Sequence, residues 1–173
     1  MRKLIVVVLL ALLSAGVYAQ DNAILNYGIT LKMPNGNWSL AETQSNDDLA
    51  VFYYKRLPIQ DQQGRQVVPN ISIITENIEE MDVVTYSAVK RLSMPFDVSE
   101  VWLPADKEIS YSNGIIYKGN YTDQFGQHTI IVAFLKKEEV GFRVICDVLT
   151  ELYEEVEPDF MAALRSIEAI DQK

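Results

Sequence analysis

Histidine and cysteine, two side chains that commonly serve as catalytic base and nucleophile, occur once each in this chain, as His128 and Cys146. A histidine-activated thiol therefore has only this pair to use. The pattern places both residues on neighbouring antiparallel strands, joined by a tight turn from Lys137 to Val140. In that register Cys146 lies opposite Ile131, which is three residues from His128, so the two side chains point to opposite faces of the sheet. The spacing argues against a Cys-His dyad, although a β-bulge would shift the register.

Other catalytic chemistries lack their residues. A serine hydrolase would also need His128, and the chain contains no G-x-S-x-G sequence. One histidine and one cysteine with 17 residues between them are too few and too far apart in sequence for a typical zinc site. Neither a G-x-G-x-x-G sequence nor a P-loop is present, so nothing indicates nucleotide binding. We therefore expect no enzymatic activity, no cofactor and no metal.

Carboxylates are the one abundant reactive group. Between residues 138 and 171 there are ten acidic residues and only two basic ones, Arg143 and Arg165. The stretch lacks the D-x-[DN]-x-[DN]-G spacing of a calcium loop. Three interpretations stay open, of which a solvated face is the commonest; the others are a docking patch for a basic partner and a divalent metal site. Numbers alone also allow a glycosidase-type pair of carboxylates.

Strands are predicted wherever apolar residues alternate or run together between turn residues. Eight segments fit, at residues 28–33, 38–43, 49–56, 70–75, 107–112, 114–122, 127–135 and 141–148. The first two are expected to form a hairpin. The last four are expected to form an antiparallel meander, in which Asn113-Gly114 is the first turn. Residues 57–69 are expected to be a long hairpin tip or a lid, and residues 94–106 an irregular crossover.

Two helices are predicted. Asp82 can cap a helix that ends near Ser93, and its apolar stripe is expected to pack on the sheet; the stripe contains Met81, Val84, Ala88 and Leu92. The second helix is expected to carry Pro158 in its first turn and to line one face with Phe160, Ala163, Leu164, Ile167 and Ile170. Because residues 130–135 are apolar on both faces, each side of the sheet must be covered. The predicted fold class is α+β, an α/β/α sandwich with a mainly antiparallel sheet flanked by helices.

The first residues have the pattern of a secretory signal. Arg2 and Lys3 precede an apolar run at residues 4–13, and Val17-Tyr18-Ala19 provides a cleavage site after Ala19. The alternative is a membrane anchor, but this run falls short of the roughly 20 apolar residues that span a bilayer. We expect residues 1–19 to be removed and residues 20–173 to form a single domain. That domain would be periplasmic or extracellular, with no membrane span after cleavage.

Charge and composition limit the partners. The 173 residues include 15 Lys and Arg and 24 Asp and Glu, a formal net charge of −9. Removal of residues 1–19 takes away two basic residues and leaves 13 − 24 = −11. No basic run offsets this charge, so nucleic acid is excluded as a partner. A single cysteine allows no internal disulfide, and we expect a monomer.

The irregular stretch before residue 107 contains the strongest binding candidates. Phe96, Trp102 and Leu103 could line a groove for a peptide or an apolar ligand, because aromatic side chains dominate recognition surfaces. The alternative is that they close the core as the crossover packs on the sheet. We name these three residues as binding candidates and name no catalytic or metal residue.

Element order and several residues resemble the PsbP-like fold family. The features are Trp38 in the strand after Pro34, a single mid-chain helix at residues 83–92, a meander at 109–148, and a closing helix Phe160-x3-Leu164-x-Ser166-Ile167. The resemblance covers about residues 26–170. The family includes the extrinsic photosystem subunit, Ran-binding Mog proteins and bacterial envelope proteins of the DcrB type. Ran binding does not fit a secretion signal.

The resemblance implies an α/β/α sandwich, usually without enzymatic activity, that acts as an accessory, docking or chaperone-like module. It supplies no catalytic residues. Two hypotheses follow. In the first, the protein is a non-enzymatic accessory module that binds an envelope protein. In the alternative, it carries a small molecule or lipid in a pocket between the sheet and a helix.

Overall fold

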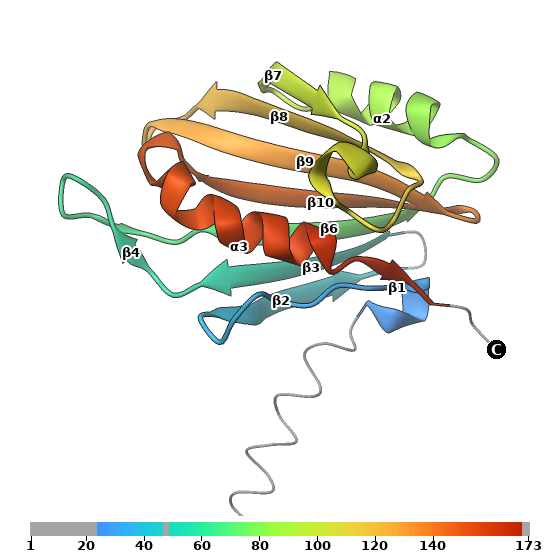
Figure 1. The fold of residues 1–173 in the computed structure, drawn as a ribbon, viewed down its shortest axis with the longest axis horizontal. Helices are drawn as coiled ribbons and strands as arrows, with labels where there is room; N and C mark the ends of the chain where they lie inside the picture. Colours follow the sequence, from blue (N-terminus) through green and yellow to red (C-terminus); the bar gives the residue numbers. More distant parts are fainter. Residues whose placement is uncertain (1–23, 47–48, 171–173) are drawn as a thin grey trace, which may run out of the picture.

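A seven-stranded antiparallel sheet forms the centre of the protein (Figure 1). The computed structural model describes residues 24–46 and 49–170. The strand order is β2-β3-β6-β10-β9-β8-β7, with bounds Trp38–Ser45, Leu49–Arg56, Asn70–Asn77, Val140–Leu149, Gln127–Lys137, Gly114–Thr122 and Asp97–Trp102. Two helices pack against this sheet, which confirms the predicted α+β class. The predicted signal segment lies outside the described residues.

One face of the sheet is covered by α3 (Tyr153–Arg165), which follows the short helix η3 (Thr150–Leu152). Val156, Phe160 and Leu164 are fully buried between α3 and the sheet. Pro158 lies inside α3, so the prediction that it occupies the first turn was wrong. Because Tyr153 and Val156 are also buried, their packing extends the helix back beyond the proline, whose missing N–H costs one helical hydrogen bond.

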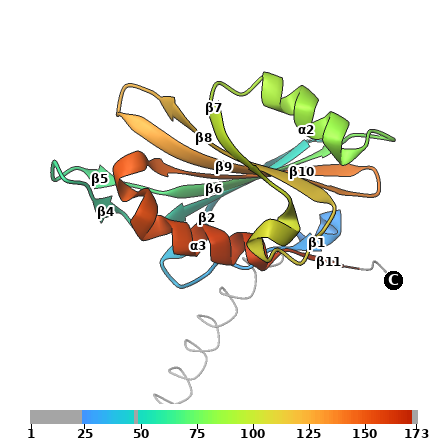
Figure 2. The ribbon, with the colours of Figure 1, turned by 45° about the horizontal axis from the view of Figure 1, so that its top comes forward.

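The opposite face is only half covered, by α2 (Val83–Leu92), which packs on β8 and β9. Asp82 caps this helix as predicted, accepting a hydrogen bond from the Thr85 backbone N–H at 2.9 Å. No helix described by the structure covers β2, β3 and β6 on this face (Figures 1 and 2). The predicted sandwich is therefore complete on one side and partial on the other.

The face that α2 buries differs from the predicted one. Tyr86 and Ser87 are fully buried, whereas Val84 and Leu92 of the predicted stripe are 61% and 87% exposed. Tyr86 donates a hydrogen bond to Glu76 on β6 at 3.0 Å, and its ring packs over Gly141 on β10. A Cβ atom at residue 141 would lie 2.8 Å from this ring, so the glycine creates the space that turns α2 onto its tyrosine side.

The two ends of the described chain pair with each other. Strand β1 (Ile29–Thr30), which follows the short helix η1 (Leu25–Tyr27), is antiparallel to β11 (Glu168–Ala169) after α3. The predicted opening hairpin between residues 28–33 and 38–43 was therefore wrong. Such a pairing joins segments far apart in sequence, and no local turn signal predicts it.

Two further predictions in the middle of the chain are corrected. Residues 97–102 form edge strand β7, where an irregular crossover was expected, and residues 107–112 form no strand. The short helix η2 (Pro104–Lys107) follows β7, and Glu108 takes a left-handed conformation with φ of 59°. Because β7 pairs with β8, it occupies the position expected for residues 107–112. Strands β4 (Ile59–Gln60) and β5 (Gln66–Val67) form the expected hairpin tip.

Candidate functional site

The thiol and the histidine lie on opposite faces of the sheet, as the register predicted. Val140 pairs with Lys137 and Cys146 with Ile131, without a bulge between them. Cys146 is fully buried on the α3 face, whereas His128 is on the other face. Burial, together with the neighbouring charge of Asp147, raises the pKa of the Cys146 thiol.

We expect Cys146 to be inert in the native protein. A thiol that is both protonated and inaccessible does not react, so Ellman's reagent should detect it at about pH 8 only after unfolding in denaturant. Time-resolved absorbance in native buffer and in guanidinium chloride measures this difference. Native-state labelling as fast as that of a free cysteine peptide would contradict the buried position.

His128 belongs to a cluster on the α2 side of the sheet. Its Nδ1 lies 2.9 Å from Oδ1 of Asp147, and its Nε2 lies 3.3 Å from Oδ1 of Asp123 in the turn after β8. The ring of Tyr121 stacks on the imidazole with centroids 4.7 Å apart. The Tyr121 hydroxyl donates to the other oxygen of Asp147 at 2.8 Å. The carboxylate of Asp147 is thus held from two sides.

A depression of about 280 Å³ opens beside this carboxylate, and we call it the Asp147 site. It is lined by Asn70, Ser72, Met94, Pro95, Phe96, Tyr121, Ile130, Ile145 and Asp147. Desolvation and then the charge of Asp147 raise the pKa of both Tyr121 and Tyr53, so two phenols from strands on either side of β10 lie close to this carboxylate. Of these lining residues only Phe96 was predicted from the sequence as a binding residue, and the polar ones were not.

The Asp147 site does not form a serine triad. Ser72 lies on β6 opposite Ile145 and His128 lies on β9 opposite Leu149, so β10 and four residues along it separate their backbones by more than about 10 Å. Both nitrogens of His128 already face carboxylates.

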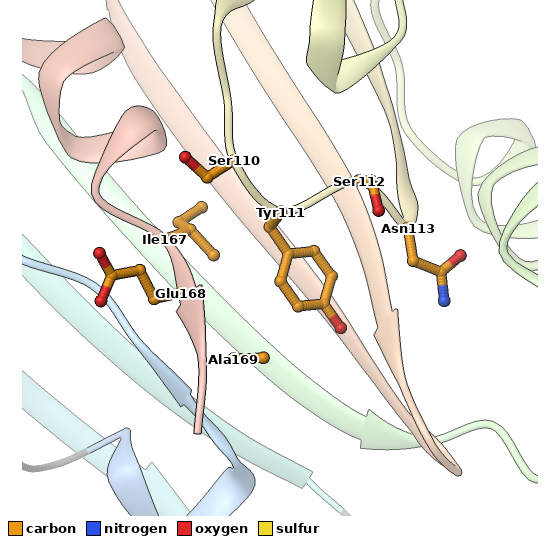
Figure 3. Close-up of a pocket in the computed structure, with 7 residues that line it drawn as sticks. All are labelled: Ser110, Tyr111, Ser112, Asn113, Ile167, Glu168 and Ala169. Atoms are coloured by element: carbon orange, nitrogen blue, oxygen red, sulfur yellow. The ribbon is translucent and has the colours of Figure 1, made fainter. Parts of the chain in front are cut away.

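A larger depression, of about 410 Å³, lies between residues 110–113 and the chain after α3 (Figure 3). Its polar side chains hold the local structure together. Tyr111 and Asn113 both donate to the carbonyl of Lys136, at 2.6 and 2.8 Å. The remaining lining residues shown in Figure 3 include Ile167 of the core and exposed Glu168. The depression is therefore the place where these segments meet, and hydrogen bonds hold them together there.

The exposed side of α2 and the edge strand β7 both carry exposed apolar side chains, which together we call the α2–β7 surface. It consists of Val84, Ala88 and Leu92 on α2 and Val98 and Val101 on β7, all of them exposed. Because Tyr86 and Lys90 point toward Glu76 on the sheet, the helical repeat of 100° per residue places Val84, Ala88 and Leu92 on the opposite side of α2, which faces away from the sheet.

The two valines of β7 point to the same side of the sheet as α2. Val101 pairs with Tyr117, whose hydroxyl lies 3.2 Å from the Ser87 hydroxyl on α2. Val98 pairs with Gly119, over which the Phe96 ring packs. Figure 2 shows α2 beside the edge of the sheet that β7 and β8 form. Groups of exposed apolar side chains are commonly found at interaction surfaces.

The charges around the α2–β7 surface that lack an oppositely charged partner in the described residues are two carboxylates and the guanidinium of Arg91. Lys90 pairs with Glu76, and Arg91 donates to the carbonyls of Met94 and Phe96. Glu80, just before α2, and Asp97, at the start of β7, have no cationic partner within the described part of the chain. A partner with basic groups around an apolar patch complements this arrangement.

Both edges of the sheet carry bulges that oppose strand addition. The register shifts between Leu40 and Glu42 in β2 and between Val98 and Glu100 in β7. Bulges twist an edge away from regular pairing with another chain. Side chains of the α2–β7 surface, and not the backbone of β7, are therefore the suitable contact groups.

The three predicted binding residues do not form one groove. Phe96 is buried under the C-terminal end of α2, and Trp102 is buried on the α3 face. The Trp102 indole donates to Glu100 at 3.0 Å and lies under the Lys107 ammonium at 3.9 Å. Leu103 is 59% exposed, at the end of β7. The strand conformation of β7 separates Phe96 and Trp102 onto opposite faces.

Some carboxylates of the acidic C-terminal stretch are engaged within the chain. Asp159 accepts hydrogen bonds from Trp38 and Arg56 at 2.9 and 3.2 Å, and Glu157 accepts one from Tyr153. In residues 24–46 and 49–170, no three His, Cys, Asp or Glu side chains are grouped to hold a metal ion. Across the same residues, no helix is long and apolar enough to cross a membrane.

Comparison with known proteins establishes only the fold. No family model matches the chain, and no curated protein is similar to it in sequence. The chain is similar in structure to PA94 of Pseudomonas aeruginosa, a protein of unknown function, with 11% identity, a TM-score of 0.55, and coverage of 79% of this chain and 100% of PA94. It is also similar to LpqN of Mycobacterium tuberculosis, which is involved in cell envelope biogenesis, with 12% identity, a TM-score of 0.52 and 83% coverage of each chain.

A third structure, from Bacteroides thetaiotaomicron, has 9% identity and a TM-score of 0.48, and this chain spans 46% of its length. The fold shared with PA94 and LpqN is thus found in bacterial proteins, one of which is involved in cell envelope biogenesis, and neither is described as an enzyme. The resemblance to PsbP-like and DcrB-type proteins stays a prediction.

Proposed function

We propose that this protein is a non-enzymatic accessory module of the bacterial envelope that docks a protein partner on the α2–β7 surface. The observation that carries the proposal is the orientation of α2, whose apolar stripe faces outward beside the two exposed valines of β7. Helices usually bury such a stripe. Because this stripe is exposed on a well-packed helix, we infer that a second protein binds over it.

The chemistry of the surface defines the partner. Its centre is aliphatic, and the unpaired charges at Glu80 and Asp97 are negative, so the partner should present an apolar face flanked by lysine or arginine. A second copy of this acidic chain, with a net charge of −9, lacks that complementarity. The predicted signal peptide and the fold shared with LpqN support an envelope location.

The carrier alternative is less well supported. Val156, Phe160 and Leu164 of α3 are fully buried against the sheet, so side chains fill the space between this helix and the strands. Tyr86 of α2 is likewise fully buried. An enclosed lipid site would have to open one of these packed layers.

Photo-crosslinking in the native host tests the docking surface. A photoreactive amino acid at Leu92 or at Val101 should capture the same protein, whereas one at Leu57, which is 60% exposed at the other end of the molecule, should not. The variant Val84→Asp/Leu92→Asp should reduce capture from Val101 about tenfold or more, since central apolar contacts dominate interface energy. Added salt should also reduce capture because the rim is charged.

The control is Leu57→Asp, which places an aspartate at a residue about as exposed as Val84. It should leave capture unchanged, and thermal unfolding should show that all variants remain folded. Equal capture from Leu57 and Leu92, or undiminished capture in the double variant, would overturn the α2–β7 surface as the docking site.

A further inference from the structure

The Asp147 site lies on the part of the sheet that α2 leaves open, and the proposed docking function does not use it. Residues of the strands, mainly of β6 and β10, form the floor of the site, and the segment after α2 forms one wall. The wall and part of the floor are apolar, formed by Met94, Phe96, Ile130 and Ile145. The opposite side is polar.

The polar side brings short hydrogen-bonding groups together. Asn70 pairs with Asp147 and Ser72 with Ile145 across the β6–β10 ladder, so both polar side chains point to the same face as the carboxylate. Tyr121 adds a phenol whose oxygen can still accept hydrogen bonds while its hydrogen is donated to Asp147. Amide, hydroxyl, phenol and carboxylate groups thus converge within one depression.

Part of the charge around the depression is matched within the chain. Glu76 pairs with Lys90 and Arg143, and the guanidinium of Arg91 lies 4.4 Å from the centre of the Phe96 ring. Asp147 already faces His128 and Tyr121 with its two oxygens. An anionic ligand would be repelled by Asp147, whereas the hydroxyl groups of an uncharged ligand can donate to its oxygens, which keep acceptor positions beyond their contacts with His128 and Tyr121. The site therefore suits an uncharged ligand.

A second depression of about 270 Å³ adjoins the first. It is lined by Glu42, Gln44, Val51 and Tyr53 on β2 and β3. Because Tyr53 and Ser72 are cross-strand partners, the two depressions share a border on the same sheet face. The combined strip alternates tyrosine rings with amide and carboxylate groups.

We propose that this open strip binds a neutral oligosaccharide, with one sugar ring in the Asp147 site and the next beside Tyr53. A pyranose ring has a C–H face that packs on apolar and aromatic side chains, and hydroxyl groups at its edge that donate to carboxylates and accept from amides. The Asp147 site offers both on opposite sides. Its volume of about 280 Å³ is just below the usual range of small-molecule pockets, which fits a single ring.

Saturation-transfer NMR and calorimetry with the purified protein test this proposal. The probes are cellobiose, maltose and N,N′-diacetylchitobiose, and n-butylamine serves as a cationic comparison. We expect at least one disaccharide to bind with a millimolar dissociation constant. Asp147→Asn and Tyr53→Ala should each weaken it about tenfold, the effect of losing roughly 1.4 kcal/mol.

Glu168→Gln is the matched control, because it neutralises an exposed carboxylate in the depression of Figure 3 and should leave binding unchanged. If Asp147→Asn does not fold, Asn70→Ala probes the same depression from β6, where the side chain is partly exposed. Binding of none of the disaccharides at millimolar concentration would overturn the proposal. So would binding of butylamine alone, or disaccharide binding that the site variants leave unchanged.

Discussion

Replacing Phe160 by alanine should destabilise the protein by about 3–5 kcal/mol, the cost of removing a large ring from a packed core. Phe160 is fully buried between α3 and the sheet, and its ring centre lies 5.9 Å from that of Trp38. The substitution removes apolar burial and leaves a cavity at the centre of the larger core. Urea denaturation monitored by circular dichroism measures the loss.

Leu92→Ala is the control for this substitution. Leu92 is 87% exposed on α2, so its truncation should change stability by no more than about 0.5 kcal/mol. A similar loss in both variants would contradict the assignment of Phe160 to the core and Leu92 to the surface. The pair of variants also shows whether the α2–β7 surface can be altered without disturbing the fold.

Glu76→Ala should cost about 3 kcal/mol, because it leaves partly buried cations without a counterion. The Glu76 carboxylate is only 12% exposed, pairs with Lys90 and with Arg143 at 3.4 Å, and accepts the Tyr86 hydroxyl. Removing it leaves Arg143 unpaired in the sheet, where 17% of its side chain is exposed. Equilibrium unfolding in urea measures the effect.

Two further variants separate the charge from the packing. Glu80→Ala, which removes a carboxylate with no cationic partner in the described chain, should change stability by less than about 0.5 kcal/mol. Adding Arg143→Met to Glu76→Ala should restore part of the loss, because the unpaired cation is then gone. No recovery in the double variant would show that the loss comes from packing alone.

Local signals in the sequence predicted local structure well. The Asp82 cap, the strand Leu49–Arg56 and the register that places Cys146 opposite Ile131 all depend on neighbouring residues or one tight turn. The pairing of β1 with β11 has no such signal, because it depends on where α3 ends relative to the first strand. Strand β7 was missed because Pro95 and a bulge interrupt its alternation.

The orientation of α2 was predicted wrongly for a physical reason. Periodicity identifies Val84, Ala88 and Leu92 as the apolar stripe, and burial normally follows that stripe. Here Tyr86 fits the space at Gly141 and bonds to Glu76, and these contacts determine the buried side. A pattern of single residue types does not contain this long-range fit.

Part of the Asp147 site could have been predicted from the sequence. The register that pairs Cys146 with Ile131 also pairs Leu149 with His128, which puts Asp147 diagonally next to the histidine on the same face. Tyr121 pairs with His128 on its other side. The position of Tyr53 near Asp147 could not have been predicted, because it depends on β6 lying between β3 and β10.

The short pair β1–β11 has a consequence for engineering. Because Ile29 lies opposite Ala169, the ends of the described domain are neighbours in space, and a short glycine-rich linker can connect them. New termini can then be opened at Gly64, at the tip of the hairpin formed by β4 and β5. Such a circular permutant would keep every strand of the central sheet intact. Strands β1 and β11 would then lie in the interior of the sequence, joined by the linker.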